Sequence, residues 1–382
     1  MDFLDLGTYQ PSYRSLVDLQ VGDVGSGTAT TTLQDTNVKV TWDLLFTLKY
    51  RTTQVTSWFT TLGTKCGTGN QAGGSSGCDL TVGNEVVFRG TVKLYGCKIR
   101  KRSAGSTRIQ YLPGITGSTG ELVDCDFQNQ GTTNSYILGT STQKVDNVFN
   151  CTFSVPTTTQ PVFSNVFVTA MERVLIASES STSYISTNAV DIGFKDTLFK
   201  GTVTAGDIRV NSGAARWSMV RPGWSQTAPA KVAFTTAHTI TLANALKEYW
   251  LFNVKVVDST GAGLANIPVK LTDTLSNVQV NTTTDTYGRI SFGSGLTANA
   301  VLVVNHYGTS GVYAQSHRSP FLLEVNTGND RDQTRQSLRT RFYWPGYETY
   351  TTTAGTFEDV NVIVPLETAS GTPTTWTEHE MP

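Results

Sequence analysis

The sequence predicts an all-β protein in two parts, a parallel β-helix followed by a β-sandwich. About 60 of the 382 residues are threonine, a β-branched residue that favours strands, and 35 are glycine, which suits turns. A small–variable–large pattern recurs every 23–28 residues in the first part. After about residue 225 it gives way to short strand patterns separated by turns, and no amphipathic helical pattern of useful length is seen.

The recurring pattern pairs a small residue with a large apolar residue two positions later. Its five occurrences are Cys97 and Ile99, Cys125 and Phe127, Cys151 and Phe153, Val174 and Ile176, and Thr197 and Phe199. Residues i and i+2 share one face of a strand, and a period of this length is typical of stacked supersecondary units. We therefore expect the small residues to form one interior row of a β-helix and the large residues to form the next.

The three cysteines of this pattern also allow a metal site or a disulfide. Zinc sites usually gather cysteines in close pairs such as CxxC, and spacings of 28 and 26 residues provide no such pair. Buried cysteine packs as a small hydrophobic residue, so we expect a core role and no metal or cofactor. Cys66 and Cys78 bracket a glycine-rich segment instead, which we interpret as a surface loop, with a disulfide as the alternative in an oxidising compartment.

Residues 80–220 resemble the right-handed parallel β-helix superfamily, which includes pectate lyases, polygalacturonases and many phage tailspikes. The resemblance rests on the period and on strand-like segments such as "GELVDCDFQNQ" and "KVDNVFNCTFSV". It implies the fold, and it carries no catalytic signature by itself.

Three segments of the second part have strand and turn patterns: "VKVVDSTGAGLANIPVKL", "TDTYGRISF" and "PGYETYT…VNVIVPLE". They resemble the Ig-like β-sandwich of carboxypeptidase regulatory-like, or transthyretin-like, domains, close to the B-type repeats of collagen adhesins. The resemblance implies a spacer, stalk or binding module. Some adhesin repeats carry an internal Lys–Asn isopeptide bond, for which Lys255 and Asn361 are the nearest candidates. Lys255 alternates with Val254 and Val256, so we expect it to point to solvent.

These patterns divide the chain into five segments. We expect an N-terminal arm at 1–27, a capped β-helix at 28–225, a linker at 226–246, the β-sandwich at 247–368 and a tail at 369–382. The formal net charge of −1 gives no electrostatic argument for binding nucleic acid or an anionic membrane. The chain opens with acidic residues and has no apolar run of membrane-spanning length, so we expect no signal peptide and no membrane segment.

Acidic residues on the outside of the β-helix are the candidates for catalysis. We expect two rows on one outer sheet, with Asp126 in one and Asp124 in the other, about 7 Å apart. The row of Asp124 continues with Asn150, Arg173 and Asp196. Paired carboxylates beside an arginine such as Arg173 are the groups that cleave glycosidic bonds. Adjacent outward acids are also common on a solvated sheet. All four histidines follow the β-helix segment, so we expect no histidine as a general base on it.

Two surface features predict contacts with other molecules. Leu175 and Leu198 fall on the outer face, where a row of exposed apolar side chains usually packs against a loop or another subunit. A basic cluster is a candidate docking patch for an acidic partner or an anionic polysaccharide, with a solvated turn as the alternative. The cluster consists of Lys98, Arg100, Lys101, Arg102 and Arg108. Separately, Arg331, Arg335 and Arg339 have helical spacing and predict a short basic helix.

Three functions fit these features. The first is a structural or attachment protein of a virus particle, similar to those of tailed phages. It would be made in the host cytoplasm, form a homo-oligomer, and contact other virion proteins and a host-surface glycan. The second function is a polysaccharide lyase or glycoside hydrolase with a C-terminal binding module. The third is a cell-surface adhesin. The first is favoured because near-neutral charge and two rigid β folds occur without a firm catalytic pattern.

Overall fold

The computed structural model describes the chain in part. Before residue 121 it gives the backbone of short strands at 5–6, 38–39, 45–48, 79–82, 86–89, 93–95, 98–101 and 109–112. After that it describes 121–129, 137–138, 144–155, 161–164, 167–187, 191–226, 231–237, 246–309, 312–350, 356–368 and 378–380. Side chains are described from Leu122 onward for most residues of these ranges, with the exception of 129, 137–138, 144–146, 155, 164, 167–169, 179–180 and 378–380.

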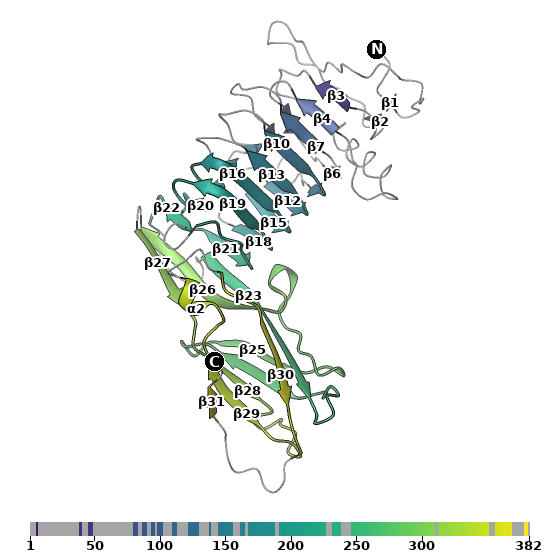
Figure 1. Cartoon of the computed structure of the whole chain (residues 1–382), viewed down its shortest axis with the longest axis vertical. Helices are drawn as coiled ribbons and strands as arrows, with labels where there is room; N and C mark the ends of the chain where they lie inside the picture. Colours follow the sequence, from purple (N-terminus) through teal and green to yellow (C-terminus); the bar gives the residue numbers. More distant parts are fainter. Residues whose placement is uncertain are drawn as a thin grey trace.

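Three parallel sheets form the first part of the protein, and the chain visits them in turn (Figure 1). The first sheet contains β3 (Leu45–Leu48), β4 (Asp79–Val82), β7 (Lys98–Lys101), β10 (Asp126–Asn129), β13 (Thr152–Val155), β16 (Leu175–Ser181) and β19 (Leu198–Val203). The second contains β5 (Val86–Arg89), β8 (Ile109–Leu112), β11 (Ile137–Leu138), β14 (Phe163–Ser164), β17 (Ile185–Thr187), β20 (Ile208–Val210) and β22 (Val232–Phe234). One strand from each sheet makes one coil, which confirms the predicted parallel β-helix.

The third sheet continues beyond the coils. Its parallel strands are β6 (Lys93–Tyr95), β9 (Glu121–Val123), β12 (Lys144–Phe149), β15 (Phe167–Glu172), β18 (Asp191–Lys195), β21 (Arg216–Val220) and β23 (Leu246–Val257). Two antiparallel strands then extend it, β26 (Ala300–Thr309) and β27 (Val312–His317). Near the N-terminus, β1 (Asp5–Leu6) and β2 (Val38–Lys39) form an antiparallel pair.

The predicted interior rows are confirmed for the described coils. Phe127 is in register with Phe153, Phe153 with Ile176, and Ile176 with Phe199, and all four are at most 2% exposed. The rings of Phe127 and Phe153 stack with their centroids 4.9 Å apart. Stacking of this kind adds to the energy of apolar burial.

The small residues form the second interior row. Cys125, Cys151, Val174 and Thr197 are each at most 2% exposed, and the Cys151 Sγ accepts a hydrogen bond from the backbone N–H of Cys125 at 3.4 Å. Burial raises the pKa of the Cys151 thiol well above its ordinary value. Both thiols therefore act as core side chains, as expected. Cys97, Cys66 and Cys78 lie outside the described residues.

One further rung was not included in the predicted series. The segment "RPGW" repeats the pattern, with Gly223 bridged to Leu198 and with Trp224 stacked on Phe199 at 5.9 Å. The segment 226–246, expected to be a linker, contains β22, which pairs in parallel with β20. The coils therefore extend further along the chain than the cysteine pattern alone predicts.

Gly201 in β19 lies where the register between β16 and β19 shifts. Its φ is +116°, and a Cβ there would lie 1.7 Å from the carbonyl oxygen of Ser178. We expect Gly201→Ala to lower the free energy of unfolding by about 1–3 kcal/mol, because backbone strain and the clash both oppose folding. Denaturant unfolding measures the loss. Gly261→Ala is the control, since Gly261 has a φ of +86° with nothing within 4 Å of the added Cβ. Equal losses of unfolding free energy in the two variants would show that the clash at Gly201 contributes nothing.

Separate sheets follow the coils, as predicted. One has the strand order β25 (Val278–Thr283), β24 (Pro268–Thr272), β28 (Phe321–Val325), β29 (Leu338–Phe342) and β31 (Glu378–Glu380). Phe252 of β23 stacks on Phe342 of β29 at 6.4 Å, so this sheet and the extended third sheet share a core. The described helices are short: η1 (Gly295–Thr297) and α2 (Tyr347–Tyr350). The predicted basic helix is wrong, because Arg339 lies in β29 and the residues before it form turns.

Strand β23 belongs to both parts of the protein. Its first half pairs with β21 of the coils, from Leu246 to Tyr249, and also with β26. Its second half, from Phe252 to Val257, pairs in parallel with β30 (Val360–Pro365). Figure 1 shows β23 running from the last coils into the C-terminal sheets. Across the parts of the chain that the structure describes, no helix is long and apolar enough to cross a membrane.

Candidate functional site

A single residue with left-handed backbone turns the chain from the third sheet into the first at successive coils. These corner residues, with φ between 49° and 56°, are Asp124, Asn150, Arg173, Asp196 and Arg221. The prediction that the first four form a row on an outer sheet is therefore wrong. Aspartate and asparagine tolerate this conformation better than other residues because their short polar side chains bond locally.

Three of the corner side chains contact the preceding coil. Asn150 Nδ2 donates to Asp124 Oδ1 at 2.6 Å, and the Arg173 guanidinium lies 5.4 Å from the centre of the Phe149 ring. Arg221 donates to Asp196 Oδ2 at 2.6 Å. These contacts give the corners a structural role.

The predicted catalytic residues occupy separate positions. Asp124 is an exposed corner residue bound by Asn150, whereas Asp126 lies in β10 and accepts a hydrogen bond from Gln128 Nε2 at 2.6 Å. Arg173 is at the corner two coils beyond Asp124, about 10 Å along the coil axis at the usual strand spacing. The structure does not bring these three groups together, and their catalytic role stays a prediction.

An outward row does run along the first sheet, one residue after each small interior residue. Its backbone register joins Lys98, Asp126, Thr152, Leu175 and Leu198. Leu198 is 49% exposed and Leu175 is partly buried beside it. The row thus changes from charged to apolar toward the C-terminal end, in line with the expected placement of the two leucines.

Part of the basic cluster can be placed. Lys98, Arg100 and Lys101 lie in β7, which pairs with β4 and β10. Arg102 and Arg108 lie outside the described residues, and the docking role of the cluster stays a prediction.

A buried polar cluster, which the sequence-based predictions do not include, joins the coils to the C-terminal sheets. Glu248 of β23 is fully buried, and its carboxylate accepts hydrogen bonds from Tyr350 OH at 2.5 Å and from Trp250 Nε1 at 2.9 Å. His306 Nε2 lies 3.0 Å from the same carboxylate, and Trp224 Nε1 of the last coil donates to it at 3.3 Å. Four segments of the chain therefore meet at one acidic group.

Lys231 adds a buried cation to this junction. Its Nζ donates to the backbone carbonyl oxygen of Tyr350 at 3.2 Å and lies 3.3 Å from the centre of the Tyr350 ring. Burial lowers the pKa of Lys231 to about 8. Burial opposes the charge of Glu248, but the hydrogen bonds from His306 and Tyr350 outweigh it and hold the Glu248 pKa below its ordinary value. The junction therefore holds a compensated charge pair.

His306 packs against the β-helix, although it follows the coils in the sequence. Its ring lies against Trp224 of the last coil, with centroids 5.9 Å apart, and Nδ1 lies 2.9 Å from Tyr313 OH. His306 is nevertheless fully buried, so it has no access to a substrate on the outer sheets. One signal in the sequence marks this site: Glu248 falls on the apolar face of an alternating strand, between Leu246 and Trp250.

Arg221 also links the two parts. Its guanidinium bridges Asp196 at the coil corner and Asp359 in the C-terminal part, with Nη1 2.9 Å from Asp359 Oδ2. Asp359 Oδ1 in turn accepts the backbone N–H of Leu251 at 3.0 Å. The three ionised groups are about one-fifth to one-third exposed.

The candidate isopeptide pair is not aligned. Strand pairing places Asn361 opposite Asn253, whose Nδ2 donates to Asn361 Oδ1 at 2.9 Å, and places Ile363 opposite Lys255. Lys255 is partly exposed between buried Val254 and Val256, as expected.

No protein-family model, curated protein or solved structure matches this chain.

Proposed function

We propose that the protein is a structural or attachment component of a virus particle, in which stacked coils form a stiff rod that carries the C-terminal sheets. One observation supports this proposal above the others. The ten-stranded sheet continues through β23, without a break, from the coils into the C-terminal part. A rod of this kind holds a terminal binding surface at a fixed distance from its base.

Two further features support a particle component. The junction around Glu248 and the bridge at Arg221 join the two parts by buried or half-buried contacts, so a hinge there would cost several hydrogen bonds. The exposed side chain of Leu198, next to Leu175, suits contact with a neighbouring subunit.

Density-gradient sedimentation of particles from the source culture tests this proposal. We expect the chain to co-sediment with intact particles after a high-salt wash, at a fixed ratio to the most abundant particle protein by mass spectrometry. A non-particle cytoplasmic protein from the same lysate is the control for carry-over. Recovery of the chain only in the particle-free fractions would contradict the proposal.

A further inference from the structure

A row of polar side chains crosses the outer face of the five-stranded sheet. Lys270 of β24 is in register with Asn281 of β25 on one side and with Glu324 of β28 on the other. Their neighbours along these strands, such as Val269 and Leu323, are fully buried in the shared core. The alternation of each strand therefore presents the polar row to solvent.

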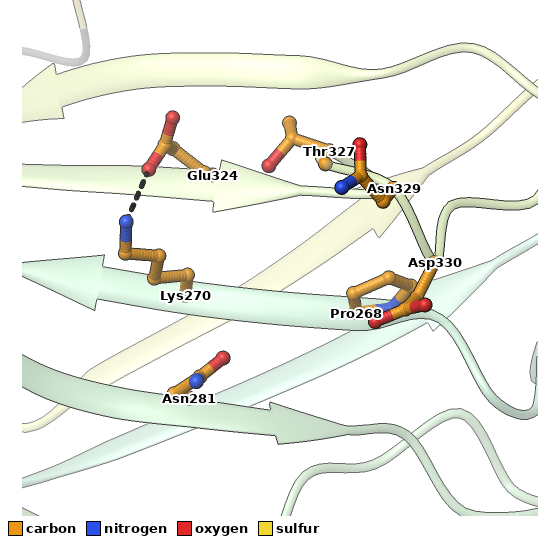
Figure 2. A pocket seen from close by; sticks show the side chains of 8 residues that line it. Pro268, Lys270, Asn281, Glu324, Thr327, Asn329 and Asp330 are labelled. Atoms are coloured by element: carbon orange, nitrogen blue, oxygen red, sulfur yellow. Dashed lines mark ion pairs between the residues drawn. The ribbon is translucent and has the colours of Figure 1, made fainter.

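This row forms the floor of a pocket of about 310 Å³. Figure 2 shows Lys270 and Glu324 facing each other across neighbouring strands, with the other lining side chains around them. The pocket is lined by Pro268, Lys270, Asn281, Glu324, Thr327, Gly328, Asn329 and Asp330. A pocket of this volume is at the lower end of the range for small-molecule sites, and it suits a ligand the size of one or two sugar rings.

The loop that forms one wall is held in place from below. Asn326 is fully buried, and its Nδ2 donates to the carbonyl oxygens of Asp332 at 2.8 Å and Gln336 at 2.9 Å. Its Oδ1 accepts the backbone N–H of Asp332 at 2.7 Å, and Ser337 Oγ donates to its carbonyl at 2.6 Å. The wall is thus preorganised, which lowers the ordering cost of binding.

The charges of the pocket nearly cancel. Glu324 lies between two cations, with Lys270 Nζ and Arg339 Nε each 3.6 Å from its carboxylate. Asp330 is exposed at the rim. The two carboxylates disfavour an anionic ligand, and the ammonium group disfavours a divalent cation. A neutral ligand with both donors and acceptors fits this balance best.

Several polar groups in the pocket are available to such a ligand. Within the described residues, the side chains of Asn281, Asn329 and Asp330 have no hydrogen-bond partner in the protein. Carboxamides both donate and accept, and a carboxylate accepts two hydrogen bonds at once. Adjacent hydroxyl groups of a sugar ring match this set of donors and acceptors.

We propose that this pocket binds a neutral saccharide unit of a surface glycan. The inference rests on the proposed attachment role for its biological meaning, because a glycan site on the sheets at the end of the rod would contact a host surface. Saccharide binding by the pocket can nevertheless be measured on the purified chain, without particles.

Saturation-transfer NMR with the purified full chain tests the pocket. The probes are glucose, galactose, mannose, rhamnose, N-acetylglucosamine and their disaccharides. We expect transfer to at least one of them, and we expect Asn281→Ala and Asp330→Ala each to weaken its binding about tenfold. Glu367→Ala is the matched control, because Glu367 is an exposed carboxylate outside the pocket. Unchanged melting temperatures of the two pocket variants show that they remain folded.

Two results would overturn the pocket assignment. One is no transfer to any probe, and the other is binding that Asn281→Ala and Asp330→Ala leave unchanged. Neither result affects sedimentation with particles, and loss of co-sedimentation does not affect saccharide binding. Failure of the pocket and failure of the particle role are therefore distinguishable.

Discussion

Replacing Glu248 with alanine should lower the free energy of unfolding by about 3–5 kcal/mol, because the change leaves several buried groups without their acceptor. The hydroxyl of Tyr350 and the indole N–H groups of Trp224 and Trp250 all point to the Glu248 carboxylate. Lys231, fully buried, would also lose its nearby counter-charge. Denaturant unfolding followed by tryptophan fluorescence measures this loss, and two of the contacting residues report on the junction directly.

The control for this substitution is Glu367→Ala, which removes an exposed carboxylate and should change stability by less than about 0.5 kcal/mol. A loss at Glu248 no larger than that of the control would contradict the stabilising role of the junction.

The stabilisation by Glu248 depends on pH with a defined sign. Because the folded-state pKa of Glu248 is lowered, its stabilisation is present above the unfolded-state pKa and is lost as pH falls through the lower folded-state value.

Replacing Phe153 with alanine should cost roughly 3–5 kcal/mol, because the ring fills the centre of the interior row. Phe153 is fully buried, stacks on Phe127 at 4.9 Å and contacts Phe163 edge-on at 4.7 Å. The closed coils leave little room for neighbours to collapse into the cavity. Denaturant unfolding of the variant gives the value.

Ser154→Ala is the matched control for Phe153, since the neighbouring side chain is partly exposed and alternates to the other face of the strand. We expect a change within about 0.5 kcal/mol for this control. A comparable, small effect of both substitutions would mean that the rings of the interior row contribute little to stability.

The interior rows could be predicted from the sequence because each rung is local. A small and a large residue stand two positions apart in one strand, and the same pair returns once per coil. The sixth rung was harder to predict because Pro222 and Gly223 replace a strand-like pair before Trp224. Gly223 leaves room for the exposed Leu198, whose Cδ1 would lie 2.6 Å from an added Cβ.

At the corners, the two-residue alternation of a strand does not predict where a side chain lies. A left-handed residue interrupts the two-residue period, so the residue before each small one leaves the sheet. Asp124, Asn150 and Asp196 are residue types that tolerate this conformation, but Arg173 and Arg221 are not. The arginines there are held by contacts with Phe149 or with carboxylates on other segments, which no local pattern predicts.

The junction could not be predicted for a related reason. Glu248 and His306 are 58 residues apart, and Glu248 and Tyr350 are 102 residues apart. Only the glutamate itself is anomalous in its local pattern, as a charged residue on the apolar face of a strand. Its partners show no such anomaly in their local sequence, because only the folded structure brings them together.

Immunogold electron microscopy of intact particles, with antibody against this chain, tests the proposed role most directly. We expect gold label on particle heads or tails, at positions that repeat from one particle to the next. Pre-absorption of the antibody with purified protein should remove the label. Label confined to cells or to free protein, with none on particles, would contradict the role in a virus particle.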